Sequence, residues 1–237
     1  MRQNNTLSRW LQRINNRLAP GCLLCSAQTG DFNQLCDACY NDLPDYPHRC
    51  KICAISLPPR QTTCGQCQVN PPRFDHAYSP YRYQAPVRQL IHQLKYGHKL
   101  HVAGILGDLL ADFLQNQLET TPDVLIPVPL HRKRIIERGF NQSNELARRI
   151  QSRLGIPINN QLVKRRIHTE SQTGLNPKKR KANIAGAFQI LTKSIPSRIL
   201  IIDDVLTTGM TSNELAKCLK KQGAISVDIA AVARAER

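Results

Sequence analysis

The chain has 237 residues and a formal net charge of +16. That length allows one or two domains with a sizeable core, and the charge predicts attraction to nucleic acid, phosphates or anionic surfaces. No apolar run approaches the roughly 20 residues that cross a bilayer, and none follows the basic N-terminal residues. These absences exclude a membrane-spanning or secreted protein, so we expect a cytoplasmic one.

Residues 1–20 are predicted to form an amphipathic helix. Arginines occupy the rest of the helical wheel. The apolar residues, which recur at helical spacing, are Leu7, Trp10, Leu11, Ile14 and Leu18. Such a helix could dock a partner or a membrane surface, although covering its own domain is the favoured interpretation.

Eight of the nine cysteines form four Cys-x-x-Cys pairs, with ten residues between each pair and the next: Cys22/Cys25, Cys36/Cys39, Cys50/Cys53 and Cys64/Cys67. Two such pairs complete a tetrahedral site of four thiolates, so residues 21–72 are predicted to form a double zinc ribbon with two structural ions. Disulfides are disfavoured because no export signal is expected. A sequential and an interleaved pairing both remain open, and Cys218 is expected to be a core thiol.

Residues 73–237 alternate between apolar strands and amphipathic helices. Strands are predicted at 78–83, 123–129, 199–202 and 225–232, and helices at 86–96, 100–118, 143–154 and 212–221. The last three of these elements are a strand, a helix and a strand in succession. This order predicts an α/β fold with a parallel sheet flanked by helices. Ligands of such sheets bind at the carboxyl ends of the strands.

Two basic segments are expected to be loops at that edge. The first, 131–142, contains Arg134 and Arg138, which suit a pyrophosphate group because arginine binds phosphate with two hydrogen bonds. The second runs from Lys164 to Lys181, and its polar middle predicts a mobile loop or lid. Residues 131–181 hold 14 lysines and arginines but 3 acidic residues, a net charge of +11. We expect a polyanion to bind here, against the alternative of a solvated surface that keeps the protein soluble.

The strand at 199–202 runs into two carboxylates and a threonine-glycine turn. The turn offers hydroxyl donors and a glycine that permits close backbone approach: Thr207, Thr208, Gly209 and Thr211. The helix that follows presents its positive end, which favours a phosphate. Asp203 and Asp204 could bond ribose hydroxyls or hold a hydrated Mg²⁺. The segment therefore predicts a sugar phosphate as ligand.

The stretch from Ile199 to Thr211 resembles the phosphoribosyl pyrophosphate (PRPP) motif of the α/β phosphoribosyltransferases. The resemblance implies that the aspartates face the ribose and that the loop takes the 5-phosphate. The expected PRPP-binding residues, with Arg134 added from the basic segment, are Asp203, Asp204, Val205, Leu206, Thr207, Thr208, Gly209, Met210, Thr211 and Arg134. The expected catalytic residues, acting with Mg²⁺, are Asp203, Asp204 and Arg138.

Further motifs occur together with this one. They are the Cys-x-x-Cys-rich front, Leu94-Lys95-Tyr96, Pro127-Val128-Pro129-Leu130 and Arg138-Gly139-Phe140-Asn141-Gln142. The set resembles the ComF family (ComFC/GntX-like proteins) over nearly the whole chain after about Gly21. The resemblance implies a zinc-ribbon front, a phosphoribosyltransferase-like domain at 73–237, and a cytoplasmic role in natural transformation. It implies incoming single-stranded DNA as partner, with proteins of the competence machinery as further partners.

Two main functions are weighed. In the first, basic residues track the backbone of single-stranded DNA while the loop holds PRPP, a nucleotide or a DNA 5-phosphate. The expected DNA contacts are Arg132, Lys133, Arg138, Lys164, Arg165, Arg166, Lys178, Lys179, Arg180 and Lys181. In the alternative, the protein is an active Mg²⁺-dependent phosphoribosyltransferase whose acceptor the sequence does not identify. A regulator that senses PRPP without catalysis is a third hypothesis.

Overall fold

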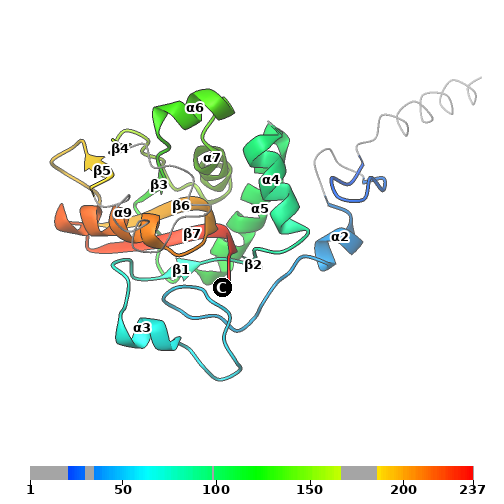
Figure 1. Cartoon of the computed structure of the whole chain (residues 1–237), viewed down its shortest axis with the longest axis horizontal. Helices are drawn as coiled ribbons and strands as arrows, with labels where there is room; N and C mark the ends of the chain where they lie inside the picture. Colours follow the sequence, from blue (N-terminus) through cyan, green and yellow to red (C-terminus); the bar gives the residue numbers. More distant parts are fainter. Residues whose placement is uncertain (1–20, 30–34, 98, 167–185, 237) are drawn as a thin grey trace, which may run out of the picture. The chain divides into compact units, whose positions relative to one another are not determined.

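The computed structural model describes residues 21–29, 35–97, 99–166 and 186–236 (Figure 1). Two compact units make up the chain, Met1–Leu43 and Pro44–Arg237. The helix predicted at 1–20 and the contacts predicted at Lys178, Lys179, Arg180 and Lys181 lie outside the described residues. Within the described ranges, no helix combines the length and the apolar character that a membrane span requires.

The smaller unit carries the first two cysteine pairs. Cys22 and Cys25 lie in a knuckle that an antiparallel bridge closes between Gly21 and Gln28. The second pair lies at the start of a helix. Cys36 directly precedes α2 (Asp37–Asn41), and Cys39 lies within its first turn.

The last two cysteine pairs repeat this arrangement inside the larger unit. Cys50 and Cys53 lie in a second knuckle, again closed by an antiparallel bridge. Helix α3 (Gly65–Val69) follows Cys64 and contains Cys67. The larger unit thus combines the second cysteine set with the sheet, and a single double-ribbon domain ending at residue 72 stays a prediction.

Five strands of the described chain form one parallel sheet in the order β1–β7–β6–β3, with β2 also paired to β7. Their bounds are β1 (Ala77–Tyr78), β2 (Tyr81–Arg82), β3 (Val124–Pro127), β6 (Arg198–Leu206) and β7 (Ser226–Arg234). Strand β6 is central, between β7 and β3. Its apolar run from Ile199 to Ile202 is fully buried because both faces of a parallel sheet are covered.

Helices cover both faces of this sheet. They are α4 (Val87–Tyr96), α5 (Leu100–Gln117), α7 (Gln142–Leu154) and α9 (Met210–Lys221). On one face, Leu215 and Leu219 of α9 share a core cluster with Ile199 and Ile201 of β6. Because side chains alternate along a strand, the residues between them point to the other face, where Figure 1 shows α5 and α7. The predicted α/β architecture with flanking helices is confirmed.

The first basic segment, expected as a loop, is largely a helix. Helix α6 (Arg132–Arg138) begins after His131, whose Nδ1 accepts a hydrogen bond from the backbone N–H of Lys133, and ends at Gly139 with a φ of 77°. None of its residues is buried, so it lacks the apolar face by which a helix is recognised in a sequence. The loop prediction was wrong for this reason.

The second basic segment begins as a strand. Strand β4 (Val163–Arg165) pairs antiparallel with β5 (Phe188–Ile190) beside the main sheet. Its Val163 and Arg165 point inward while Lys164 is exposed, the alternation of a half-buried strand. The predicted lid continues into 167–185, which lies outside the described residues.

Candidate functional site

An aspartate pair lies at the carboxyl end of the central strand β6. Asp204 is buried, and its Oδ1 lies 2.7 Å from Nζ of Lys95. Lys95 extends from α4, whose inner face buries apolar residues at helical spacing. Burial alone would lower the pKa of Lys95, but the charge and hydrogen bond of Asp204 outweigh it and raise that pKa. The lysine therefore remains an ammonium group beside the sheet edge.

Asp203 has a different environment. Its Oδ1 accepts hydrogen bonds from the backbone N–H of Asp204 at 2.9 Å and from Oγ of Ser143 at 3.3 Å. Burial raises the pKa of Asp203 to about 7, and the charge of Asp204 adds to this effect, against the opposing charge of Lys95. Asp203 therefore binds a proton more readily than an exposed aspartate does, and a cation bound nearby would favour its carboxylate form.

The predicted phosphate loop joins β6 to α9. Gly209, the residue before α9, has a φ of 71°, a conformation that favours glycine. The backbone N–H of Met210 donates to Oγ1 of Thr208 at 3.4 Å. A Cβ on Gly209 would meet the ring of Phe74 at 3.7 Å, so this ring supports the turn. The loop therefore ends at the N-terminus of a 12-residue helix, which favours an anion.

Arg165 of β4 lies within electrostatic reach of Asp203, and the arginines of α6 lie close to one another and to Arg165. Burial lowers the pKa of Arg165, the charge of Arg134 lowers it further, and the charge of Asp203 raises it. Burial also lowers the pKa of Arg134, as does the charge of Arg138. A cluster of three guanidinium groups favours an anionic ligand, because arginine forms charge-assisted hydrogen bonds with phosphate.

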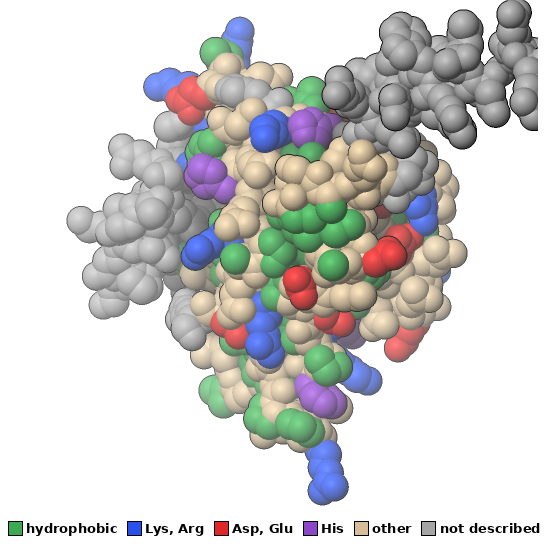
Figure 2. Space-filling view, turned by 90° about the vertical axis from the view of Figure 1, so that its right-hand side faces the viewer, with side chains coloured by type: hydrophobic (Ala, Val, Ile, Leu, Met, Phe, Trp, Pro, Cys, Tyr) green, Lys and Arg blue, Asp and Glu red, His purple; other side chains and the backbone are tan. Residues whose placement is uncertain are grey.

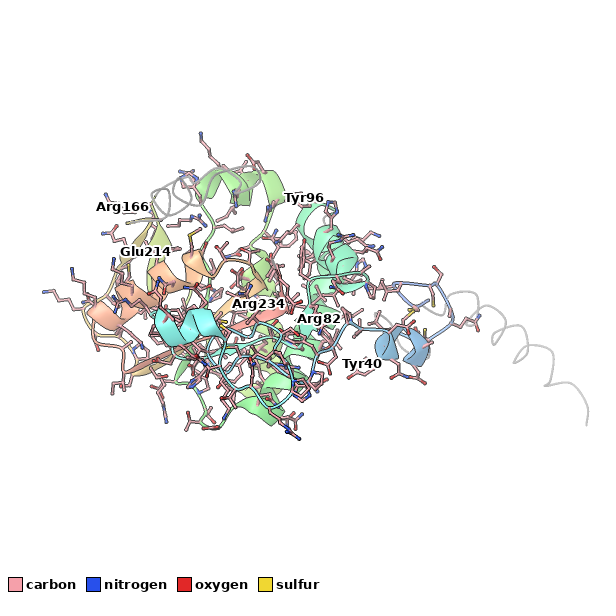
Figure 3. The ribbon with its side chains drawn as sticks, turned by 60° about the horizontal axis from the view of Figure 1, so that its bottom comes forward. Tyr40, Arg82, Tyr96, Arg166, Glu214 and Arg234 are labelled. Carbon is pink, nitrogen blue, oxygen red and sulfur yellow. The ribbon has the colours of Figure 1, made fainter. Side chains whose placement is uncertain are left out.

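An exposed aromatic ring lies beside this cluster. Tyr96, the last residue of α4, is 59% exposed, and the guanidinium carbon of Arg138 lies 5.2 Å from its ring centroid. Arg138 also donates to Oε1 of Gln142 at 3.1 Å. Figure 3 shows Tyr96 at the end of α4. The ring therefore lies near Arg138 and His92, whose ring centroid is 4.7 Å away, and stays largely open to solvent.

A cavity of about 590 Å³ opens beside α6 and β4. This volume lies in the range of small-molecule sites, roughly 300–1,000 Å³. Its lining is basic with an apolar part and consists of Pro129, Leu130, His131, Arg132, Ile135, Val163, Lys164, Arg165 and Arg166. Such a lining suits a nucleotide-sized anion.

The described DNA-contact candidates fall into two groups. Arg132 and Lys133 on α6, with Lys164 and Arg166 near β4, are exposed. The other two are less exposed, because Arg138 is half-buried and Arg165 is a buried residue of the cavity lining with its guanidinium carbon 5.8 Å from the ring centroid of Phe188. On the face drawn in Figure 2, described basic side chains are scattered among acidic and apolar ones, so the positive charge is not concentrated there.

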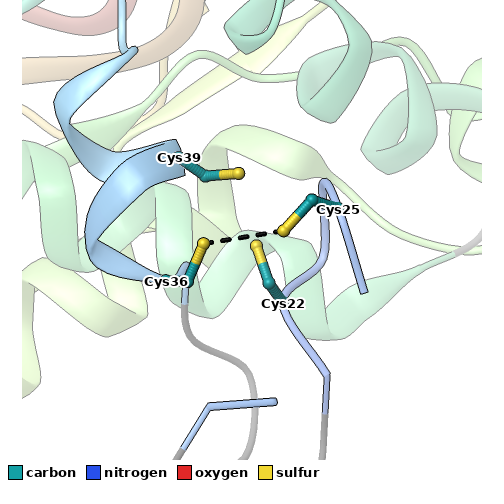
Figure 4. Close-up of side chains that lie close together, drawn as sticks. All are labelled: Cys22, Cys25, Cys36 and Cys39. Atoms are coloured by element: carbon teal, nitrogen blue, oxygen red, sulfur yellow. Dashed lines mark hydrogen bonds between the residues drawn. The ribbon is translucent and has the colours of Figure 1, made fainter. Parts of the chain in front are cut away.

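Eight cysteines form two clusters of four. Within each cluster, the sulfur atoms all lie within 4.8 Å of one another. The first cluster (Figure 4) is Cys22, Cys25, Cys36 and Cys39, and the second cluster is Cys50, Cys53, Cys64 and Cys67. This is the sequential one of the two pairing schemes. The Sγ atoms of Cys25 and Cys36 are 3.6 Å apart, as are those of Cys53 and Cys64. A tetrahedron with metal–sulfur bonds of about 2.3 Å has edges of about 3.8 Å, so each cluster could hold a metal ion such as zinc.

In each cluster, backbone hydrogen bonds lower the pKa of the first cysteine. Burial raises the pKa of Cys22, but surrounding backbone N–H donors lower it more, to about 6. The same opposition lowers the pKa of Cys50, whose Sγ accepts from the backbone N–H of Cys64 at 3.3 Å. Hydrogen bonds of this kind orient metal ligands. Cys218 is half-buried on α9, and burial raises its pKa.

Three residues that bond to the aspartates or to the start of the loop were not among the predicted site residues. Lys95 pairs with Asp204, and Ser143 donates to Asp203. Arg234, the last residue of β7, donates from Nη1 to the backbone oxygen of Leu206 at 2.8 Å. Lys95 stands in the Leu94-Lys95-Tyr96 motif, which was a signal for it, but no local pattern marks the other two residues.

The parallel sheet, the aspartates at the end of its central strand and the glycine turn before α9 define a phosphoribosyltransferase-type α/β domain. In agreement, the phosphoribosyl transferase domain family matches residues 95–237. Competence protein F of Haemophilus influenzae is 35% identical over 160 residues, which cover 65% of this chain and 70% of that protein.

Two further relatives carry related names. The DNA utilization protein YhgH of Shigella flexneri is 34% identical over 163 residues, which cover 67% of this chain and 72% of that protein. Competence protein ComFC of Bacillus subtilis is 30% identical over 151 residues, which cover 61% of this chain and 58% of that protein. The chain belongs to the ComF family of competence and DNA utilization proteins.

Proposed function

We propose that the protein handles internalised single-stranded DNA in the cytoplasm during natural transformation and that its phosphate loop binds PRPP or a related phosphate. The observation that carries this proposal is the position of the loop 207–209 at the N-terminus of α9, together with a cavity lined by basic residues after β3 and in β4. The names of the relatives, which refer to competence and DNA utilization, support the DNA part. Proteins of the competence machinery are proposed as further partners.

The proposed sugar-phosphate site combines three kinds of group. Hydroxyl and N–H groups of the loop between Thr207 and Thr211 would take the 5-phosphate, at the N-terminus of α9. Val205 and Leu206 are buried residues of β6 that position the start of this loop. The aspartates would bond the ribose hydroxyls or a hydrated Mg²⁺, which supplies charge neutralisation when bound. Arg134 and Arg138 would bind the pyrophosphate.

The proposed DNA path follows the exposed cations of α6 and β4. Arg132, Lys133, Lys164 and Arg166 are accessible to backbone phosphates, and Tyr96 would stack on a base. Arg165 and Arg138 would contact the single-stranded DNA where the DNA passes the cavity. Lys178, Lys179, Arg180 and Lys181 are proposed as further DNA contacts.

Reversing two of these charges should weaken DNA binding and its salt dependence. In an Arg132→Glu/Lys133→Glu variant, loss of two phosphate contacts should reduce the slope of log affinity against log salt by about 1.4. Fluorescence anisotropy with a labelled oligothymidine at several salt concentrations measures this slope. Reversal of all four charges from Lys178 to Lys181 should reduce it further.

The matched control for that variant is Lys193→Glu/Lys221→Glu. Both lysines are exposed, and Lys221 ends α9 at the helix terminus opposite the phosphate loop. This control has the same net charge but should keep the slope of the wild-type protein. Equal slopes in all three proteins would contradict the proposed DNA path.

Two zinc ions are proposed to stabilise the cysteine clusters. Four thiolates fill the coordination sphere of zinc and leave no position for a substrate, so both ions would be structural. Elemental analysis of the full chain should give two zinc ions per protein, and a Cys22→Ser/Cys39→Ser variant should give one. A preparation that is folded and free of metal would contradict this proposal.

The alternative proposal is an active phosphoribosyltransferase. It is favoured by the raised pKa of Asp203, because perturbed carboxyl groups are frequent in active sites. An acceptor would form a bond to C1 of PRPP while the bond to pyrophosphate breaks, with Arg138 or Arg134 stabilising the leaving group and Mg²⁺ supplying further charge neutralisation. Pyrophosphate release in a screen of acceptors tests this function, and no release with a protein that binds PRPP would favour the binding role.

A further inference from the structure

One buried arginine links the second cluster to the phosphate loop. The side chain of Arg234 donates from Nε to the backbone oxygen of Cys53 at 2.8 Å. Its Nη1 donates to the backbone oxygens of Leu206 at 2.8 Å and of Thr207. Arg234 is 8% exposed, and Figure 3 shows it beside Arg82, its partner in the pairing of β2 with β7. A single guanidinium group thus joins a metal-ligand residue to the first residues of the loop.

The second cluster is also part of the core beneath the loop. Ala54, next to Cys53, is fully buried in the cluster of apolar residues that contains Leu206 and Phe74. The hydroxyl group of Tyr46 donates to the backbone oxygen of Ala54 at 2.7 Å. The knuckle and the start of the loop therefore share one apolar core and are also joined by the hydrogen bonds of Arg234.

The cost of burying the guanidinium group of Arg234 makes its hydrogen bonds depend on the position of the backbone oxygen of Cys53. A buried guanidinium group is costly unless its donors are satisfied, and here backbone oxygens accept hydrogen bonds from Nε and Nη1, including that of Ala235 at 2.6 Å. A metal bond to Cys53 would fix the backbone of that residue and hence one of these acceptors. An opened knuckle would remove the acceptor of Nε, and a shift of the guanidinium group toward a new acceptor would disturb its bonds to Leu206 and Thr207.

We propose that the metal ion of the second cluster sets the conformation of the phosphate loop through Arg234, which acts as a positioning residue. The affinity of the loop for a phosphate ligand then depends on the second cluster but not on the first. The dependence of affinity rests on the proposed PRPP site, whereas the dependence of loop conformation does not.

The test compares equivalent cysteine variants of the two clusters. Cys50→Ser/Cys67→Ser removes the second metal and keeps Cys53, and Cys22→Ser/Cys39→Ser removes the first metal at the corresponding positions. In the full chain, hydrogen exchange of the loop amides should become about 10-fold faster in the second-cluster variant. The affinity for PRPP with Mg²⁺ should fall by about 10-fold in the same variant. Both quantities should stay at the wild-type value in the first-cluster variant.

A second pair of variants keeps the proposal testable if loss of the metal unfolds the chain. Arg234→Lys and Arg234→Gln should retain both zinc ions, because neither removes a ligand. The lysine can reach either the loop oxygens or that of Cys53 but cannot bridge them, so it should not rescue loop protection. In an Arg234→Gln background, removal of the second metal should add little to loop exchange, as expected for two members of one pathway.

Unchanged loop exchange in the second-cluster variant and in both Arg234 variants would overturn the proposal, as would equal effects of the two cysteine variants. Faster loop exchange in a protein that never binds PRPP would support the role of Arg234 and contradict the proposed ligand.

Discussion

Replacing Asp204 by asparagine should lower the free energy of unfolding of the larger unit by about 3 kcal/mol, because removing one partner of a buried ion pair leaves the other charge uncompensated. The pair with Lys95 is 2.7 Å long, and its side chains are 20% and 10% exposed. An asparagine oxygen can accept a hydrogen bond from the ammonium group, but it cannot neutralise its charge. Denaturant unfolding of Asp204→Asn at neutral pH measures the loss.

A surface ion pair provides the control. Asp45 lies 3.0 Å from Arg49 and is 66% exposed. Its replacement by asparagine should cost less than about 1 kcal/mol, because exposed pairs are screened by solvent. Equal losses in Asp45→Asn and Asp204→Asn would contradict the assignment of a buried pair to Lys95.

Replacing the neighbouring Asp203 by asparagine should have the opposite effect on stability. The pKa of Asp203 is raised by burial from 3.8 to about 7 in the folded chain. The folded protein therefore binds more protons than the unfolded chain between these two pH values, and its stability falls as pH rises through that window. The amide of asparagine can still accept hydrogen bonds from Ser143 and from the backbone of Asp204. At pH 8, Asp203→Asn should be more stable than the wild type by about 1–3 kcal/mol.

Denaturant unfolding between pH 4 and pH 8 tests this sign. The gain of Asp203→Asn over the wild type should be smallest near pH 4 and should grow to its full size near pH 7. In an Asp204→Asn background the gain should shrink, since part of the raised pKa of Asp203 comes from the charge of Asp204. A destabilised Asp203→Asn at pH 8 would contradict the account.

The loop and the cysteine clusters were predictable because their signals are local. An apolar strand, two acids and a glycine turn stand in succession between Ile199 and Thr211, and the Cys-x-x-Cys spacing indicates metal ligands directly. The sequential pairing of the cysteines required the fold, because the spacing is equal throughout. Helix α6 was missed because it buries no face.

The partners of the site could not be predicted because they come from distant elements. Ser143 and Asp203 lie 60 residues apart, and Arg234 and Cys53 lie 181 residues apart. No local sequence pattern connects the members of either pair. The parallel sheet brings the ends of β6, β7 and α7 together. Arg234 looks like an ordinary charged residue at a strand end, although it is buried among backbone oxygens.

The central claim is that the aspartates and the loop bind a sugar phosphate. Calorimetric titration of PRPP with Mg²⁺ into the wild type and into Asp203→Asn tests it most directly, because the variant should be the more stable protein. We expect saturable, Mg²⁺-dependent binding to the wild type and an affinity about 100-fold lower, or about 2.7 kcal/mol, in the variant. Equal affinity in the two proteins, or no binding to a zinc-loaded wild type, would contradict the claim.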